Sequence, residues 1–182
     1  MRVDPASHRV VGVRFVPSPN YDERPEGVSV SLIVVHNISL PPNEFGGSYI
    51  EQLFTNRLNP NDHPYFLEIA DNKVSAHILI RRSGEVLQFV PFNKRAWHAG
   101  ESSYKGKAKV NDFSIGIELE GADEIPYEPE QYAVLATLVD SLRMAYPSLS
   151  KEDITGHSDI APSRKTDPGL VFNWEKFTDL LA

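Results

Sequence analysis

The stretch Val28–His36, VSVSLIVVH, constrains the fold more than any other part of the chain. Its second half is the near-continuous apolar run LIVV, which is typical of a β-strand covered on both faces. Such a strand belongs inside a sheet that has packed layers above and below it. The 182 residues are enough to build this arrangement within one domain and are short for two.

Five further segments predict the rest of the sheet and its helical cover. Ser75–Arg82 and Glu85–Pro91 read as strands joined by a Ser-Gly pair, which is a hairpin signal. Phe113–Glu120, FSIGIELE, is another strand that alternates after its first residues. Pro129–Tyr146 places apolar residues at helical spacing, and Asn173–Leu181 is a short amphipathic helix. The sequence therefore predicts a single α/β domain over residues 1–182, with a central mixed sheet flanked by helices.

A long irregular stretch separates the first strand from the hairpin. Residues 37–73 are interrupted by four prolines, and within them Ser48–Asn56 is a candidate helix. An ordered segment of this length in a compact domain is usually functional. We expect it to form a lid or a pocket wall.

Composition excludes several classes of function. The chain has no cysteine, which rules out a disulfide framework, a thiolate metal site and a Cys nucleophile. Its net charge of −7 argues against a broad nucleic-acid footprint. The first residues lack the apolar core of a signal peptide, and no apolar run approaches the length of a membrane span. We therefore expect a cytoplasmic protein that binds neither nucleic acid nor membrane.

Charge is distributed unevenly despite the acidic total. Between residues 81 and 109 seven basic residues stand against two glutamates, a local excess of 7 − 2 = +5. Such a run is either a solvated face or a positively charged wall for an anionic small substrate. The basic residues are Arg81, Arg82, Lys94, Arg95, Lys105, Lys107 and Lys109.

Three residues form a candidate metal site. His36 stands where the apolar strand ends, and His157 and Asp167 lie ten residues apart in the loop TGHSDIAPSRKTDPG. A lone histidine at a strand end is more often structural, but here partners are available. Two histidines and one carboxylate suit zinc, because three protein ligands leave a fourth position for water.

Two further residues give such a water a reaction to perform. Glu118 or Glu120, which share one face of their strand, can accept its proton, and the pattern alone does not choose between them. Lys165 can neutralise the oxyanion formed when water attacks a carbonyl. Each residue also has an ordinary interpretation, as a strand carboxylate or a solvated loop lysine. Together with the metal triad, they favour hydrolysis of an amide or ester.

The segment RAWHAG adds Trp97 and His98 beside the basic run. Trp97 is either a core residue or an apolar ring presented to a sugar. His77, inside the strand SAHILI, is better explained as a packed or supporting histidine than as a fourth ligand. His8 and His63 carry no functional prediction.

The motifs VVHNISLPP, HPYF, VSAHILIRRSGE, RAWHAG, NDFSIGIELEG and GHSDIAPSRKTDPG occur in this order between about residues 17 and 174. Together they strongly resemble the AmpD family of 1,6-anhydro-N-acetylmuramyl-L-alanine amidases. This family belongs to the wider group of zinc amidases of the T7-lysozyme and peptidoglycan-recognition type. The resemblance implies that fold and one zinc ion per chain, held by His36, His157 and Asp167.

The resemblance also assigns roles in catalysis and binding. It implies that Glu118 is the proton acceptor and Lys165 the transition-state stabiliser. The reaction implied is cleavage of the amide between the lactyl group of anhydro-muramic acid and L-alanine in cell-wall turnover muropeptides. Asn37, Trp97, His98 and Lys109 are candidate substrate contacts, although Lys109 stands where other members have Arg. We expect a small-molecule substrate and no obligate protein partner.

Two competing functions fit the sequence less well than this one. A non-catalytic muropeptide-binding module typically loses a metal ligand, whereas this chain keeps all three together with Glu118 and Lys165. An amidase acting on intact peptidoglycan outside the cytoplasm needs an export signal, and the sequence shows none.

Overall fold

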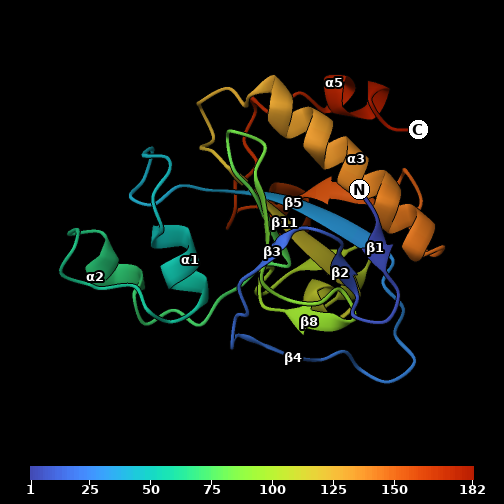
Figure 1. Ribbon diagram of the computed structural model, residues 1–182, viewed down its shortest axis with the longest axis horizontal. Helices are drawn as coiled ribbons and strands as arrows, with labels where there is room; N and C mark the ends of the chain where they lie inside the picture. Colours follow the sequence, from blue (N-terminus) through green and yellow to red (C-terminus); the bar gives the residue numbers. More distant parts are fainter.

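A six-stranded mixed sheet forms the centre of the computed structural model, which describes residues 1–182 (Figure 1). The strand order is β12-β5-β11-β6-β7-β3. The first four strands in this order run parallel, β7 pairs antiparallel with β6, and β3 runs parallel to β7. The strands are β3 (Arg14–Phe15), β5 (Leu32–Ile38), β6 (Ile78–Ile80), β7 (Val86–Gln88), β11 (Ser114–Glu120) and β12 (Ile154–Gly156).

Short two-stranded pairs and six helical segments surround this sheet. The pairs are β1 (Val3–Asp4) with β2 (Arg9–Val10), β4 (Tyr21–Glu23) with β8 (Lys94–Ala96), and β9 (Ser103–Tyr104) with β10 (Lys107–Ala108). The helices are α1 (Tyr49–Phe54), α2 (Phe66–Ile69), the 3₁₀ turn η1 (Val110–Asp112), α3 (Pro129–Ala145), α4 (His157–Ile160) and α5 (Trp174–Asp179). None of them is long and apolar enough to cross a lipid bilayer.

The apolar strand is covered on both faces, as its sequence predicts. Ile33 and Val35 pack into the core beneath α3, whereas Leu32 and Val34 pack on the other face. All four side chains are fully buried. The strand begins at Leu32 and extends to Ile38, so its regular part lies later than the predicted range.

Helix α3 forms one layer of the molecule. It begins at Pro129, where Glu128 N donates to Gln131 Oε1, and it buries Leu135, Leu138 and Leu142 against the sheet. Figure 1 shows α3 lying along one face of the sheet with α5 on its outer side. The predicted helices Pro129–Tyr146 and Asn173–Leu181 are thus confirmed to within two residues at each end.

The predicted hairpin is present but short. Its two strands pair over Ile78–Ile80 and Val86–Gln88, and Gly84 occupies the turn with a φ of 82°. The expected strand Ser75–Arg82 is shorter because Ser75 N bonds to Trp97 O instead of extending the ladder.

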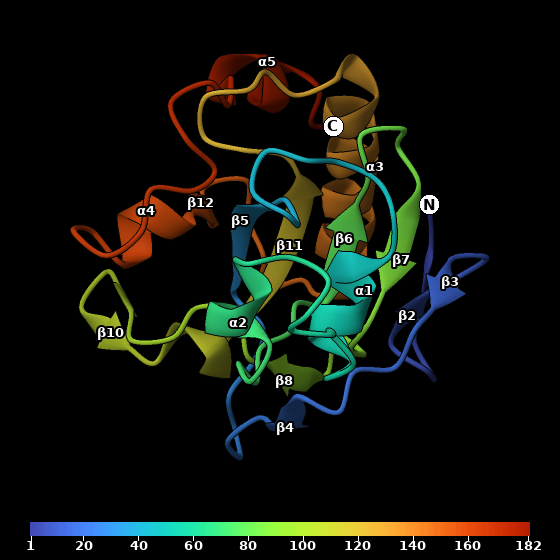
Figure 2. The same ribbon diagram turned by 90° about the vertical axis from the view of Figure 1, so that its left-hand side faces the viewer.

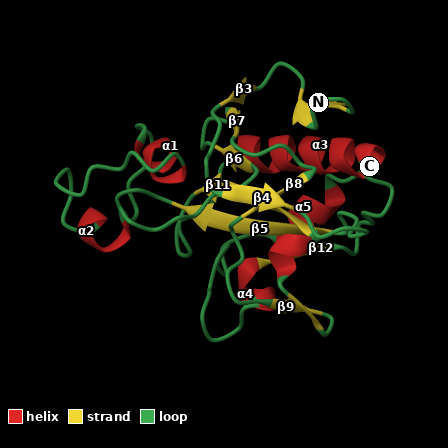
Figure 3. Ribbon diagram, turned by 90° about the horizontal axis from the view of Figure 1, so that it is seen from below, coloured by secondary structure: helices red, strands yellow, loops and turns green.

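The irregular stretch 37–73 supplies α1 and α2. Leu53, Phe54 and Phe66 pack against Leu79 and Phe89 of the hairpin region. Figure 2 shows both helices in front of β6 and β11, and Figure 3 shows them at one end of the sheet, with α4 on the side away from α3. The candidate helix Ser48–Asn56 is confirmed as α1, and α2 was not predicted.

Candidate metal and catalytic site

Three adjacent parallel strands bring their functional side chains to one face of the sheet. Glu118 of β11 stands opposite His36 of β5 in the strand register, and Gly156 of β12 stands opposite Val35. His157 follows Gly156 directly. Odd-numbered residues of β5 and β11 pack under α3, so the even-numbered His36 and Glu118 face the opposite side. The site therefore lies where parallel strands run toward their carboxyl ends, a usual place for ligands in α/β sheets.

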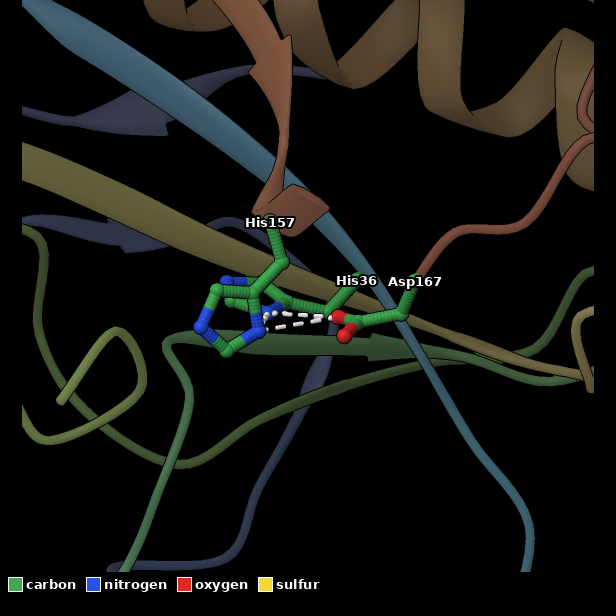
Figure 4. A group of neighbouring side chains, drawn as sticks. All are labelled: His36, His157 and Asp167. Atoms are coloured by element: carbon green, nitrogen blue, oxygen red, sulfur yellow. Dashed lines mark hydrogen bonds and ion pairs between the residues drawn. The ribbon is translucent and has the colours of Figure 1, made fainter. Parts of the chain in front are cut away.

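The three predicted metal ligands converge (Figure 4). His36 Nδ1 lies 2.9 Å from His157 Nδ1 and 3.1 Å from Asp167 Oδ2, and His157 Nδ1 lies 3.0 Å from the same oxygen. A tetrahedral zinc ion with bonds of about 2.0–2.1 Å separates neighbouring ligand atoms by about 3.3 Å. The donor types and their spacing thus fit one face of a zinc tetrahedron, and these three residues form a group able to hold a metal ion.

His36 and Asp167 are in the protonation states that metal binding requires. Burial lowers the pKa of His36 to about 4, and contact with Asp167 offsets this only in part, so the imidazole is neutral. Burial alone would raise the pKa of the Asp167 carboxyl, but its contacts with His157 and His36 hold that pKa well below its ordinary value. A neutral imidazole and an ionised carboxylate are the forms that coordinate metal ions.

The loop that carries Lys165 and Asp167 is anchored by main-chain contacts. Ser158 N donates to the backbone oxygen of Asp167 at 2.9 Å. The Tyr127 hydroxyl donates to the backbone oxygen of Pro168 at 2.8 Å. These two bonds tie the backbones of Asp167 and Pro168 to α4 and to the loop before α3, which holds the carboxylate near the histidines.

Glu118 is a buried carboxylate with an unsatisfied oxygen. Its exposed fraction is 8%, and its Oε2 atom has no hydrogen-bond partner. Burial raises the pKa of Glu118 well above its ordinary value, the charge of Asp167 adds to this, and Lys165 acts in the opposite direction. Such a carboxylate is free to exchange a proton with a molecule in the cavity.

Glu120 has different surroundings, although it shares the strand face of Glu118. Its carboxylate accepts hydrogen bonds from Arg81 Nη1 at 3.0 Å, from Arg82 N at 3.1 Å and from Gly46 N at 2.7 Å. Both of its oxygens therefore already accept hydrogen bonds from the protein. Of the two glutamates, which the alternation pattern leaves equivalent, only Glu118 has a buried oxygen without a hydrogen-bond partner.

The contrast between these glutamates predicts opposite effects on stability. In metal-free protein, a raised pKa means that the folded state holds the Glu118 proton more tightly than the unfolded state does. The contribution of Glu118 to the free energy of unfolding therefore decreases as the pH rises above 4.5, the ordinary pKa of a glutamate. We expect Glu118→Gln to be more stable than wild type at pH 7 and equal to it below pH 4.5.

Glu120→Gln is the matched control for that prediction. It weakens the buried pair with Arg81, so it is expected to be less stable than wild type at pH 7. Urea unfolding of both variants between pH 4 and pH 8, with chelator present, measures the two effects. A Glu118→Gln protein that is less stable than wild type at pH 7 would contradict the prediction.

A cavity of about 370 Å³ opens onto these groups. Its polar lining includes the three candidate ligands, Glu118, Lys165, Asn37 and His98, and its apolar lining includes Trp97, Leu53, Phe54, Tyr65 and Ile69. Residues of the 37–73 stretch therefore form a pocket wall, as expected. Of the predicted substrate contacts, Asn37, Trp97 and His98 line the cavity, whereas Lys109 does not.

Comparison with known proteins agrees with this geometry. Residues 26–170 match the family described as N-acetylmuramoyl-L-alanine amidase. The chain belongs to this amidase family. It is 57% identical over 173 residues to the 1,6-anhydro-N-acetylmuramyl-L-alanine amidase AmpD of Escherichia coli (strain K12). The alignment covers 95% of this chain and 94% of the relative.

Two solved structures of family members extend the comparison. A crystal structure of an AmpD derivative has a TM-score of 0.96 at 54% identity, and the alignment covers 100% of both chains. The E. coli amidase AmiD was solved with the substrate anhydro-N-acetylmuramic acid-L-Ala-D-gamma-Glu-L-Lys. It has a TM-score of 0.59 at 27% identity, covering 88% of this chain and 62% of that one. The resemblance seen in the sequence motifs and the fold that it implied are confirmed.

The basic run between residues 81 and 109 does not form a free positively charged wall, which was one of its two interpretations. Five of its seven basic side chains form ion pairs with carboxylates, which neutralise them. The pairs are Arg81 with Glu51 and Glu120, Arg82 with Glu128, Lys94 with Glu23, Arg95 with Asp22 and Asp112, and Lys105 with Asp153. Counting charge along the sequence cannot find these pairs, because the partners lie on distant segments.

Two further histidines, His77 and His98, lie near the three-donor cluster and are not part of it. His77 is fully buried; its Nδ1 accepts from Gly116 N and its Nε2 donates to Lys94 O, so it is a packed histidine as expected. His98 Nδ1 lies 2.9 Å from His36 Nε2, and its Nε2 lies 3.1 Å from Ser114 Oγ. Both ring nitrogens of His98 are thus engaged by protein groups. Sequence reasoning did not identify Ser114, and an isolated serine in a strand gives no signal.

Proposed function

We propose that the chain is a zinc amidase that hydrolyses the amide between the lactyl group of 1,6-anhydro-N-acetylmuramic acid and L-alanine in soluble muropeptides. The observation that carries the proposal is the unpartnered oxygen of buried Glu118, which stands in register with His36 of the three-donor cluster. The names of the AmpD relatives and the ligand of the AmiD structure support the anhydro-muropeptide as substrate. The proposal includes a cytoplasmic location for the reaction, which soluble turnover fragments as substrates favour.

In this proposal His36, His157 and Asp167 hold one zinc ion per chain. When bound, zinc polarises the scissile carbonyl and lowers the pKa of water to about 7. The three residues would supply two imidazole nitrogens and one carboxylate oxygen within 3.1 Å of one another, and the cavity that they line would give water access to the metal. An open position is what distinguishes a catalytic zinc site from a structural one.

Glu118 serves as the base and then as the acid. Its unpartnered Oε2 takes a proton from the attacking water and returns it to the nitrogen of L-alanine as the amide bond breaks. The raised pKa suits this double use, because a carboxyl group with an ordinary pKa is too weak a base to keep the proton between the two steps. The buried position also keeps bulk water from removing that proton.

Lys165 stabilises the negative charge that develops on the carbonyl oxygen. It lines the cavity two residues before Asp167, and its charge already acts on Glu118 and His36. We expect Lys165→Ala to keep its zinc and to lose about 10²–10³ in kcat with little change in KM. Lys165→Arg, which keeps the charge, should lose less. Wild-type kcat in zinc-loaded Lys165→Ala would remove the residue from catalysis.

Recognition of the sugar and peptide falls to the remaining cavity wall. Trp97 presents an aromatic ring beside the apolar residues of α1 and α2, which suits the face of the anhydro sugar. Asn37 is held by its Nδ2 atom, which donates to Asp123 Oδ1 at 2.8 Å and leaves its Oδ1 atom for an amide of the substrate. Lys109, outside the cavity lining, is proposed to meet carboxylates of the stem peptide that extend beyond the cavity.

Mass spectrometry tests the proposal directly. Incubation of the purified protein with an anhydro-muropeptide should release the free stem peptide and anhydro-N-acetylmuramic acid. Treatment with a chelator should abolish the reaction, and added zinc should restore it. Intact substrate after prolonged incubation with zinc-loaded protein would refute the amidase activity and leave a muropeptide-binding module as the alternative.

A further inference from the structure

The two histidines of the metal cluster are supported from behind by two consecutive residues. On the side away from the cluster, His36 Nε2 lies 2.9 Å from His98 Nδ1. His157 Nε2 lies 3.1 Å from the backbone oxygen of Ala99. One short segment, residues 98–99, therefore contacts the outer nitrogen of both rings.

The chemistry of these contacts determines which ring nitrogen carries the proton. The carbonyl oxygen of Ala99 can only accept, so His157 Nε2 carries its hydrogen and His157 Nδ1 presents a lone pair to the cluster. For His36 to present Nδ1 likewise, its Nε2–H must donate to His98 Nδ1. His98 then donates its own Nε2–H to Ser114 Oγ, 3.1 Å away, and a serine hydroxyl accepts such a bond.

Groups that touch neither the ligands nor the cavity hold this segment in place. Asn111 Oδ1 accepts from His98 N at 3.2 Å and from Ala99 N at 2.9 Å. Arg164 Nη2 donates to the backbone oxygens of Ala99 and Glu101, both at 2.6 Å. Asn111 does not line the cavity, so its side chain can affect the position of the cluster only through its hydrogen bonds to residues 98–99.

The position of the His98 ring also depends on the neighbouring strand. A Cβ atom placed on Gly116 of β11 would lie 2.4 Å from His98 Cγ, well inside contact distance. The ring therefore lies directly against the backbone of β11, between Ser114 and His36.

We propose that residues 98–99 form a common support that presets both histidines to bind the metal through Nδ1, and that Asn111 is the positioning residue of this support. The inference rests on the proposed zinc site. It assigns His98 to metal orientation, with both nitrogens used by the protein, in place of substrate contact. Loss of a hydrogen-bond partner behind a metal ligand typically lowers metal affinity by about 10–100-fold.

Zinc affinity of the full-length protein, measured by competition with a chromogenic chelator, tests this proposal. We expect His98→Leu and Asn111→Ala each to weaken zinc binding by about 10–100-fold. His98→Asn keeps an accepting oxygen near the position of Nδ1, so it should bind within a few-fold of wild type. Asn173→Ala, which removes the side-chain cap of α5 outside the cavity lining, controls for a general loss of stability.

A second measurement needs no substitution. In zinc-loaded protein labelled with ¹⁵N, both histidines should show hydrogen on Nε2, and His36 should show scalar coupling across its hydrogen bond to His98. Absence of that coupling, or folded His98→Leu and Asn111→Ala proteins that bind zinc as tightly as wild type, would overturn the inference. If wild type itself binds no zinc, the proposed function fails, which is a separate result.

Discussion

Asp167→Ala is expected to purify without a stoichiometric metal ion and to show no detectable cleavage of an anhydro-muropeptide. The Asp167 carboxylate is the only anionic member of the cluster, and its Oδ2 lies within 3.1 Å of both histidine nitrogens. Without it two imidazoles remain, which are too few to fix a zinc ion in a catalytic geometry. Metal analysis by mass spectrometry, together with the amidase assay, measures both losses.

Thermal unfolding gives this prediction an independent readout. A ligand that binds only the folded state raises its stability in proportion to the logarithm of its concentration. Added zinc should therefore raise the Tm of wild type and leave the Tm of Asp167→Ala unchanged. Asp123→Asn is the matched control, because Asp123 is a neighbouring carboxylate outside the three-donor cluster. Full zinc occupancy in Asp167→Ala would remove this residue from the metal site.

Glu118→Gln is expected to keep its zinc and to lose about 10²–10⁴ in kcat, since a side-chain amide cannot accept the proton of the attacking water. Substrate affinity should change far less, because the proton moves only as the transition state is reached. Glu124→Gln, an exposed neighbour on the same side of the molecule, should behave as wild type.

The pH dependence of wild-type activity provides a second test of Glu118 as the proton acceptor. A base must be deprotonated to act, and burial raises the pKa of Glu118. Activity should therefore fall as pH decreases through that raised pKa, at a higher pH than for an ordinary carboxyl group. Zinc-loaded Glu118→Gln with activity within a few-fold of wild type would exclude Glu118 as the proton acceptor.

Much of the fold is determined by local patterns in the sequence. The run LIVV predicts a strand buried on both faces because its apolar side chains alternate between two covered layers. Helix α3 follows from apolar spacing and from Pro129 at its first turn. Both signals are strong because each depends on contacts repeated along one element. Helix α2 is only four residues long, which is too short to leave a periodic signal.

The sequence also determined the chemical inventory of the site, whereas the tertiary structure decided how each group is used. His36, His157 and Asp167 were identifiable as residue types suited to zinc, but only the strand register and the anchored loop bring their donor atoms within 3.1 Å. Glu118 and Glu120 are equivalent by alternation, and only the tertiary contacts of Glu120 with Arg81, Arg82 N and Gly46 N distinguish them. Tertiary contacts likewise decided that the basic residues between 81 and 109 are paired with carboxylates, and that residues 98–99 lie behind the two histidines. Ion pairs and hydrogen bonds join residues distant in sequence, so local composition and spacing carry no record of them.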